Sequence, residues 1–192
     1  MSSTEMPFDK TCHIKVIKTI AEGLKIAGKL DTYLELGVRN GSCFNAIAPL
    51  AKGKAYAVDI NPKYEKFCKW NKNTDKWNKN LVWNGCPTNE FFEKLDKAVK
   101  FDLVFIDACH THEQSLVDFK NVWPKVNPNG IICMHDTYPP AETFLTDHYC
   151  SDSYKTADYI RKNYQEKCEI VTLPFFFGVT IIRKADKQLM WI

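Results

Sequence analysis

Apolar positions follow two different spacings along the chain. In residues 12–29 they recur every three to four positions, which predicts an amphipathic N-terminal helix at about residues 10–29. The same spacing predicts helices at 44–50, 62–70, 89–95, 113–122 and 154–164, whereas short apolar runs predict strands at 32–36, 54–59, 81–84, 101–107, 130–135, 169–173 and 177–183. Strands that alternate with helices in this way indicate βαβ units and a mostly parallel sheet of the α/β class.

Composition narrows the class of protein without identifying it. The chain has 192 residues, which favours a single domain over residues 1–192 with its core at about 31–183. The net charge of +3 is too balanced to indicate binding to nucleic acid or to a membrane surface, and no apolar run reaches the length of a membrane span. Eight cysteines without a CxxC pair, in a sequence without a signal peptide, indicate reduced thiols and a cytoplasmic protein.

The first predicted strand leads into a glycine-containing turn that is suited to a ligand. Glu35 precedes Gly37, Gly41 and Ser42, and Asp59 ends the next predicted strand. Glycines let a backbone approach a ligand closely, and an acid at the second strand end suits the two hydroxyls of a ribose. Together these residues predict a nucleotide-like cofactor at the carboxyl ends of the strands.

Acidic residues also follow the fourth and fifth predicted strands, as Asp107 and Asp136. Neighbouring parallel strands lie about 4.8 Å apart, so the two carboxylates converge if these strands are adjacent. Such carboxylates repel each other unless a cation separates them, and Mg²⁺ or another divalent metal is the economical explanation. His110, three residues beyond Asp107, suits a general base at neutral pH, whereas His112 is predicted to begin the next helix.

These residues resemble those of a known enzyme family. The motif Glu35-Leu-Gly-x-x-x-Gly-Ser, with Asp59 and the strand Phe-Asp-Leu-Val-Phe-Ile-Asp107, is similar to class I S-adenosylmethionine-dependent methyltransferases. The runs Ile106-Asp-x-x-His-x-x-Glu113 and Gly130-x-Ile-x-x-His135-Asp136 more narrowly resemble metal-dependent O-methyltransferases, grouped with macrocin and mycinamicin O-methyltransferases and cephalosporin-hydroxylase-like proteins. Catechol O-methyltransferase is a more distant relative. The resemblance covers about residues 31–183.

The resemblance implies a Rossmann-like sheet of seven strands, mostly parallel, with an antiparallel last strand and helices on both faces. It also implies which residues contact the S-adenosylmethionine cofactor: Glu35, Gly37, Gly41, Ser42, Asp59, Gly85, Cys86 and Asp107. Asp107 and Asp136 match the family's metal ligands, and His110 matches its proposed catalytic base. Where sugar-type enzymes have a further acid this chain has His135, and where catechol-type enzymes have Asn it has Thr137. We take His135 as the third candidate ligand.

The predicted function is methyl transfer from S-adenosylmethionine to a hydroxyl of a small-molecule acceptor, either a sugar diol or a catechol, assisted by a divalent metal. Two alternatives stay open. His110, His112 and His135 with two carboxylates also fit a metal-dependent oxygenase or hydroxylase. The second alternative is a protein without catalytic activity, either a cofactor-binding protein or a subunit that docks a partner through its apolar residues 189–192. A homo-oligomer is compatible with either, and no nucleic-acid or membrane partner is expected.

Overall fold

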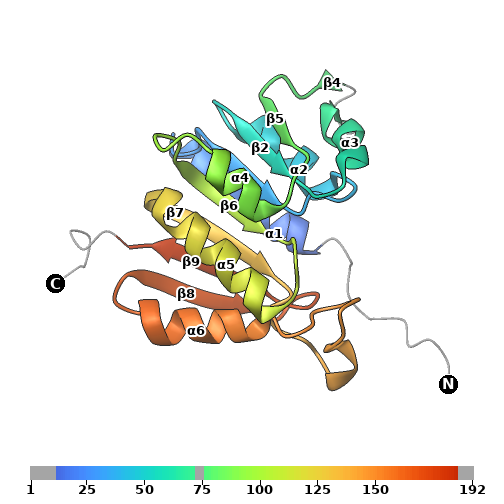
Figure 1. Cartoon of the computed structure of the whole chain (residues 1–192). Coiled ribbons are helices and arrows are strands. Elements are labelled where there is room, and N and C mark those ends of the chain that lie inside the picture. The colour runs from blue at the N-terminus through green and yellow to red at the C-terminus, as the bar shows by residue number, and fades with distance from the viewer. Residues whose placement is uncertain (1–11, 72–75, 186–192) are drawn as a thin grey trace.

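The computed structural model describes residues 12–71 and 76–185, built around a seven-stranded sheet in the order β5-β2-β1-β6-β7-β9-β8 (Figure 1). The strands are Tyr33–Leu36 (β1), Ala55–Val58 (β2), Leu81–Asn84 (β5), Phe101–Ile106 (β6), Val126–His135 (β7), Cys168–Leu173 (β8) and Val179–Lys184 (β9). Pairs among β1, β2, β5, β6 and β7 are parallel, and β9 is antiparallel to both of its neighbours. The predicted Rossmann-like sheet with an antiparallel last strand is confirmed.

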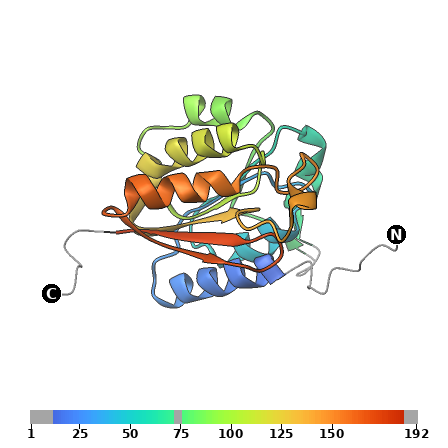
Figure 2. The ribbon, with the colours of Figure 1, turned by 90° about the horizontal axis from the view of Figure 1, so that it is seen from below.

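Helices cover both faces of this sheet (Figure 2). One face is covered by α1 (Cys12–Ile26) and α2 (Ser42–Ile47), and the other by α4 (Thr88–Lys94), α5 (His112–Val122) and α6 (Tyr154–Tyr164). The short α3 (Glu65–Lys69) lies beside β5 (Figure 1). Single 3₁₀ turns occupy Ala48–Leu50, Pro62–Tyr64, Trp123–Lys125 and Glu142–Phe144. Among the helices of the described residues, none is long and apolar enough to cross a membrane.

Burial on both faces explains why the inner strands are apolar almost throughout. Tyr33 belongs to the core cluster under α1 and α2, where its ring stacks near that of Phe44. Leu34 belongs to the opposite cluster, which contains Phe119 of α5. Glu35 follows on the same strand and is only 1% exposed. A carboxyl group in that position needs compensating partners, because burying an unpaired charge costs several kcal/mol.

Most predicted elements differ from the structure by a few residues at their ends, and two differences are larger. β7 begins at Val126 rather than at residue 130, because Val126 still pairs with Phe101 before a register shift in β6. The predicted helix at 62–70 ends at Lys69, and an antiparallel pair, β3 (Trp70–Asn71) with β4 (Lys76–Trp77), follows it. Each strand of this local hairpin has only two residues, too few to give an alternating apolar pattern in the sequence. Residues 10–11 of the predicted N-terminal helix and the apolar residues 189–192 lie outside the described residues.

A close backbone contact at Gly37 gives a test of the fold. Gly37 has φ of 84°, and a Cβ there would overlap the backbone of Asp107 and Ala108. We expect Gly37→Ala to lower the free energy of unfolding by about 2–4 kcal/mol, measured by urea denaturation. Gly23 in α1 is the matched control, because a Cβ there meets nothing within 4 Å. Gly23→Ala should stabilise the chain by about 0.5–1 kcal/mol, and equal effects would contradict the contact.

Candidate active site

The parallel register brings the predicted site residues to one edge of the sheet. Leu36 pairs with Val58 and with Ile106, Val58 pairs with Asn84, and Ile106 pairs with Met134. The residues that directly follow these strands are Gly37, Asp59, Gly85, Asp107 and, after His135, Asp136. Ligands of open α/β sheets bind at this carboxyl edge. The candidate residues therefore lie together at the carboxyl edge of the sheet.

The turn after β1 is held by Asp59. One carboxylate oxygen of Asp59 accepts a hydrogen bond from the amide of Arg39 at 2.9 Å, and the other accepts from the amide of Asn61 at 2.8 Å. Gly37 and Gly41 adopt φ of 84° and 72°, a backbone conformation that L side chains rarely adopt. Asp59 therefore connects two strand-end turns, and each of its oxygens keeps a further lone pair for a ligand.

Ser42 and the pair Gly85-Cys86 border this turn from two sides. Ser42 is exposed at the start of α2, and its amide donates to the side-chain oxygen of Asn40 at 3.1 Å. Gly85 is exposed after β5, whereas Cys86 is partly buried against the apolar cluster that contains Phe91. Burial raises the pKa of the Cys86 thiol, so this side chain presents a neutral surface.

Glu35 lies beneath the turn, not on its open side. The hydroxyl of Tyr33 donates to its carboxyl oxygen at 2.5 Å. Burial raises the pKa of Glu35 to about 8, and the charge of Asp107 adds to the effect, although the Tyr33 hydrogen bond opposes it. In the chain without a ligand, Glu35 is therefore largely protonated at neutral pH. A cationic group bound above it would favour ionisation.

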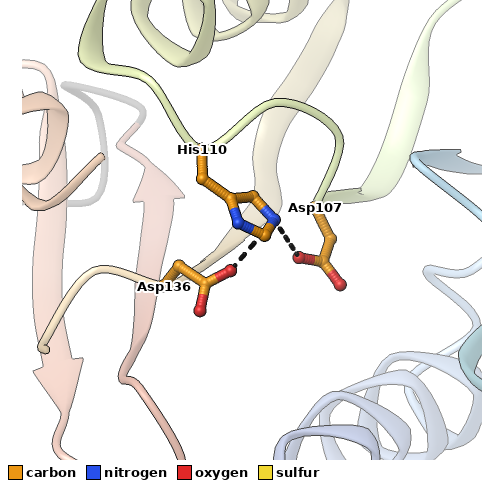
Figure 3. Close-up of side chains that lie close together, drawn as sticks. All are labelled: Asp107, His110 and Asp136. Carbon is orange, nitrogen blue, oxygen red and sulfur yellow. Dashed lines mark ion pairs between the residues drawn. The ribbon is translucent and has the colours of Figure 1, made fainter. Parts of the chain in front are cut away.

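The acidic residues after β6 and β7 converge on one imidazole, that of His110 (Figure 3). Its Nε2 lies 3.1 Å from Asp136 Oδ2 and 3.7 Å from Asp107 Oδ1. Asp136 is buried, with a side chain 4% exposed, whereas those of Asp107 and His110 are 25% and 29% exposed. The cluster is therefore accessible from one side and closed from the other.

His135 faces the same two carboxylates from the buried side. Its Nδ1 lies 3.3 Å from Asp107 Oδ1 and 3.3 Å from Asp136 Oδ2. The sequence analysis proposes His135 as the third metal ligand, beside Asp107 and Asp136. In the structure its Nδ1 approaches the same two carboxylate oxygens as His110 Nε2, so that two imidazoles and two carboxylates form one cluster.

Backbone carbonyls fix the orientation of both rings. The Nδ1 of His110 is hydrogen-bonded to the carbonyl of Tyr149, and the Nε2 of His135 lies 3.0 Å from the carbonyl of Phe176. A carbonyl only accepts, so each of these nitrogens carries a proton. The opposite nitrogen of each ring is directed at Asp107 and Asp136. Ligating histidines in metal proteins have this arrangement.

The charges of the cluster stabilise one another. Burial opposes protonation of His110, but its interaction with Asp107 and the charge of Asp136 outweigh it and raise the pKa of His110 to about 9. The pKa of His135 is raised for the same reason, with Asp107 as its main partner. Burial opposes ionisation of Asp107, yet His135 and His110 hold the pKa of this carboxyl below its usual range. The imidazoles thus supply the positive charge that the carboxylates require.

The donor atoms also fit a divalent metal. Ligands about 2.1 Å from a common ion lie about 3.0 Å apart at the 90° angles of an octahedron and about 3.4 Å apart in a tetrahedron. The four separations between an imidazole nitrogen and a carboxylate oxygen are 3.1–3.7 Å. Donor atoms of Asp107, His110 and Asp136 all lie within 4.8 Å of one another. The cluster needs only small shifts to surround an ion.

Several residues that contact the histidine and aspartate cluster were not predicted from the sequence. Tyr149 and Phe176 act through backbone carbonyls, which leave no signal in a sequence. His13 was assigned to the N-terminal helix alone, yet its ring centroid lies 4.4 Å from that of His135. Cys150, one of the eight cysteines predicted only to be reduced thiols, has its Sγ 3.5 Å from Asp136 Oδ1. None of these contacts follows from local spacing.

His112 begins α5, as the sequence predicted. Its amide donates to Asp152 at 2.6 Å, and its Nδ1 lies 2.8 Å from the hydroxyl of Thr156 in α6. These contacts join α5 to α6. We therefore assign His112 a structural role.

A cavity of about 530 Å³ lies between α6 and the loop that follows Asp136. It is lined by Thr137, Tyr138, Pro139, Tyr154, Asp158, Arg161, Thr172 and Pro174. The hydroxyl of Thr180 connects Thr172 with Thr137 through hydrogen bonds of 2.7 and 2.8 Å. His135 pairs with Val179, and successive side chains of a strand point to opposite faces of the sheet. The side chain of Thr180 therefore lies on the face opposite that of His135. The cavity is thus separate from the imidazole cluster.

The buried carboxyl group of Glu35 predicts a pH-dependent stability. Between its ordinary pKa of 4.5 and its folded value of about 8, the folded chain retains a proton that the unfolded chain releases. The free energy of unfolding should therefore fall as the pH rises through this range. Glu35→Gln should remove the loss and raise stability at pH 8 by on the order of 1–3 kcal/mol, with little gain near pH 4. Exposed Glu22, exchanged for Gln, is the control, and parallel pH profiles for the Glu35→Gln variant and its parent would disprove the shift.

Comparisons with known proteins agree with this geometry. A family model described as a methyltransferase domain matches residues 34–137, just over half of the chain. The structure is similar to that of the O-methyltransferase TomG of Streptomyces achromogenes, which is involved in tomaymycin synthesis and was solved with S-adenosylmethionine. The two chains are 12% identical, the TM-score is 0.69, and the similarity covers 90% of this chain and 80% of TomG. It is also similar to an O-methyltransferase of Bacillus cereus solved with S-adenosylhomocysteine, at 14% identity and a TM-score of 0.68, covering 90% and 81%.

The comparison with curated proteins gave no match. The family match and the strand order together confirm the resemblance inferred from Glu35, Gly37, Gly41 and Asp59. The chain belongs to the methyltransferase-domain family and has the class I fold of S-adenosylmethionine-dependent methyltransferases.

Proposed function

We propose that this methyltransferase transfers the methyl group of S-adenosylmethionine to a hydroxyl oxygen of a small molecule, assisted by a divalent metal. The observation that carries the proposal is the convergence of two carboxylates and two imidazoles beside the glycine turn. Gly37 packs directly on the backbone of Asp107, so the cofactor turn and the acidic cluster are neighbours. A methyl donor at the first and an acceptor at the second would be adjacent.

Cofactor binding is supported by the turn between β1 and α2. Gly37 and Gly41 provide a backbone without side chains at the point where a ligand approaches, and Asp59 provides carboxylate oxygens for ribose hydroxyls. We assign Ser42, Gly85 and Cys86 to the border of the same site. Glu35 would ionise on binding, because the cofactor carries an ammonium and a sulfonium charge.

Asp107, His135 and Asp136 would hold the metal, in agreement with the donor spacing. When bound, a divalent ion lowers the pKa of a hydroxyl that it polarises. The side chains themselves fix where the acceptor lies. They direct its oxygen toward the open side of the cluster, where Asp107 and His110 are partly exposed. Positioning of donor and acceptor in line contributes on the order of 7–11 kcal/mol in favourable cases.

His110 would accept the proton of the acceptor hydroxyl. Its Nδ1 is occupied by the Tyr149 carbonyl, so Nε2 is the nitrogen that carries the lone pair in the neutral ring. Nε2 is the ring nitrogen directed at the two carboxylates (Figure 3), and the His110 side chain is 29% exposed. A base in this position removes the proton as the oxygen attacks the methyl group. The cation of a bound metal would oppose the charges that raise the pKa of His110 and favour its neutral form.

The two imidazoles are also compatible with a second candidate function, that of a metal-dependent oxygenase or hydroxylase. Histidine and carboxylate ligands with open positions are typical of non-haem iron enzymes. Oxygen consumption by the Fe²⁺-loaded protein without S-adenosylmethionine would favour this candidate. Methyl transfer under anaerobic conditions would exclude it as the main activity.

The cofactor assignment predicts specific binding of S-adenosylhomocysteine. Calorimetry should give a micromolar dissociation constant for this ligand and no binding of NAD. Asp59→Ala should weaken binding by about 10–100-fold, because hydrogen bonds from the ribose hydroxyls to a charged group are lost. Asp136→Ala should leave the affinity nearly unchanged, since Asp136 lies on the acceptor side. No heat with S-adenosylhomocysteine at up to millimolar concentration would end the methyltransferase proposal.

The metal assignment predicts that chelation abolishes turnover. Transfer of a radiolabelled methyl group to a panel of vicinal diols and catechols should stop after EDTA treatment and return with a divalent ion. Asp107→Asn and Asp136→Asn should each lower the activity by at least about 100-fold, because a charged ligand is lost. Equal rates with and without EDTA would show that the carboxylates have a structural role.

The base assignment predicts a loss of turnover without a loss of cofactor affinity. His110→Ala should lower kcat by about 10²–10⁴-fold, the usual contribution of a general base. A base acts in its neutral form, so the rate of the parent should rise with pH as His110 loses its proton, and this limb should be absent from the variant. The exposed His148 is the control, and His148→Ala should keep both rate and limb. A His110→Ala variant with most of its activity would place the base elsewhere.

A further inference from the structure

We propose that the metal site prefers a first-row transition ion such as Mn²⁺, Fe²⁺, Co²⁺ or Zn²⁺ over Mg²⁺, because the imidazole of His135 is its third protein ligand. The inference rests on the proposed function only for the presence of an ion between Asp107 and Asp136. Its own content is the nature of that ion. A nitrogen donor in the ligand set changes which cations the site accepts.

The ring of His135 is oriented as a ligand. Its Nε2 donates to the carbonyl of Phe176 at 3.0 Å, which leaves the lone pair of the neutral ring on Nδ1. That nitrogen is equidistant from Asp107 Oδ1 and Asp136 Oδ2, at 3.3 Å from each. Both separations lie within the range of about 3.0–3.4 Å that is expected between two ligands of one small ion. Nδ1 therefore points at the position that an ion between the carboxylates would occupy.

Packing prevents this ring from turning away. The His135 side chain is 6% exposed. Its centroid lies 4.4 Å from that of the His13 ring, 5.9 Å from that of Phe176 and 6.4 Å from that of Phe105. A water molecule that would replace the imidazole in the ligand shell of Mg²⁺ has no room unless the ring leaves. The nitrogen donor is built into the site.

Thr137, the other candidate for the third position, is directed elsewhere. Its hydroxyl accepts a hydrogen bond from the hydroxyl of Thr180 at 2.8 Å, and Thr180 lies on the face of the sheet opposite His135. Thr137 is 5% exposed. Its oxygen is thus engaged on the α6 side. Of the two positions at which related enzymes carry an oxygen ligand, only that of His135 faces the acidic cluster.

The donor set decides the class of cation. Mg²⁺ binds oxygen ligands, keeps several water molecules and loses them reluctantly. Imidazole is a softer donor that suits iron, zinc, cobalt and copper, and affinities of mixed sites rise along the first-row series. Two carboxylates and one imidazole therefore favour a transition ion. His110 remains on the open side as a base and need not ligate.

Spectroscopy of the metal-loaded protein tests the ligand directly. Pulsed EPR of the Mn²⁺ form should show hyperfine coupling to a directly bound ¹⁴N. The coupling should disappear in His135→Asn, which offers an amide oxygen in place of Nδ1, and should persist in His110→Asn and in the surface control His148→Asn. Coupling that survives in His135→Asn but is lost in His110→Asn would overturn the assignment, as would an Mn²⁺ form with no nitrogen coupling.

Binding measurements test the preference. In calorimetric competition, Co²⁺ and Mn²⁺ should bind the parent at least about 100-fold more tightly than Mg²⁺. In His135→Asn this ratio should fall by about tenfold or more, while it stays the same in His148→Asn. An unchanged ratio in His135→Asn overturns the proposal. If that variant fails to fold, which circular dichroism reveals, the parent decides: tighter binding of Mg²⁺ than of Mn²⁺, or equal binding, refutes it.

These outcomes are separable from failure of the proposed function. S-adenosylhomocysteine binding is measured on the same preparations without added metal. A chain that binds the transition ion through His135 but not S-adenosylhomocysteine would retain the metal inference and lose the methyltransferase proposal. A chain that binds S-adenosylhomocysteine and prefers Mg²⁺ would have the opposite result.

Discussion

Compensation of two neighbouring carboxylates is the constraint on which the site depends. The parallel register of β6 and β7 brings Asp107 and Asp136 to the same edge, where like charges repel strongly in a partly buried setting. In the chain without a ligand, protons on His110 and His135 supply the balancing charge, and the pKa of both is raised as a result. A metal would take over this role. Binding of a metal would therefore be linked to proton release, because the imidazoles would no longer need to be cationic.

The insertion of β9 between β7 and β8 supplies the rest of the geometry. The chain leaves β7 at Asp136, passes through a long loop and α6, forms β8, and returns as β9 beside β7. This order places the turn between β8 and β9 next to the end of β7, where the Phe176 carbonyl meets His135. The loop returns Tyr149 to His110. Both imidazoles are thus oriented by distant backbone groups, 41 residues away along the chain for His135 and 39 for His110.

The sequence predicted the sheet and the composition of the site better than its geometry. Apolar runs and strand-end residues follow from local chemistry, so Gly37, Asp59, Asp107 and Asp136 could be placed at one edge without a structure. The antiparallel position of β9 came only from the resemblance, because periodicity does not distinguish the direction of a strand. The contact of His13 with His135 could not be predicted, since helix docking depends on the whole core. The carbonyls of Tyr149 and Phe176 could not be predicted either, because every residue has a carbonyl and the sequence does not indicate which one accepts a given hydrogen bond.

Strained backbone concentrates where this unpredictable geometry is built. Asp136, Phe176 and Phe177 are non-glycine residues with φ of 58°, 31° and 65°, conformations that cost on the order of 1–3 kcal/mol each. The Phe177 carbonyl accepts a hydrogen bond from the Tyr138 amide at 2.7 Å, which joins the two strained turns. The turn after β1 places its left-handed conformations mostly on glycines instead, at lower cost. The strained non-glycine residues thus lie at and beside Asp136 and His135, whereas the turn after β1 depends on glycines, which a sequence reveals.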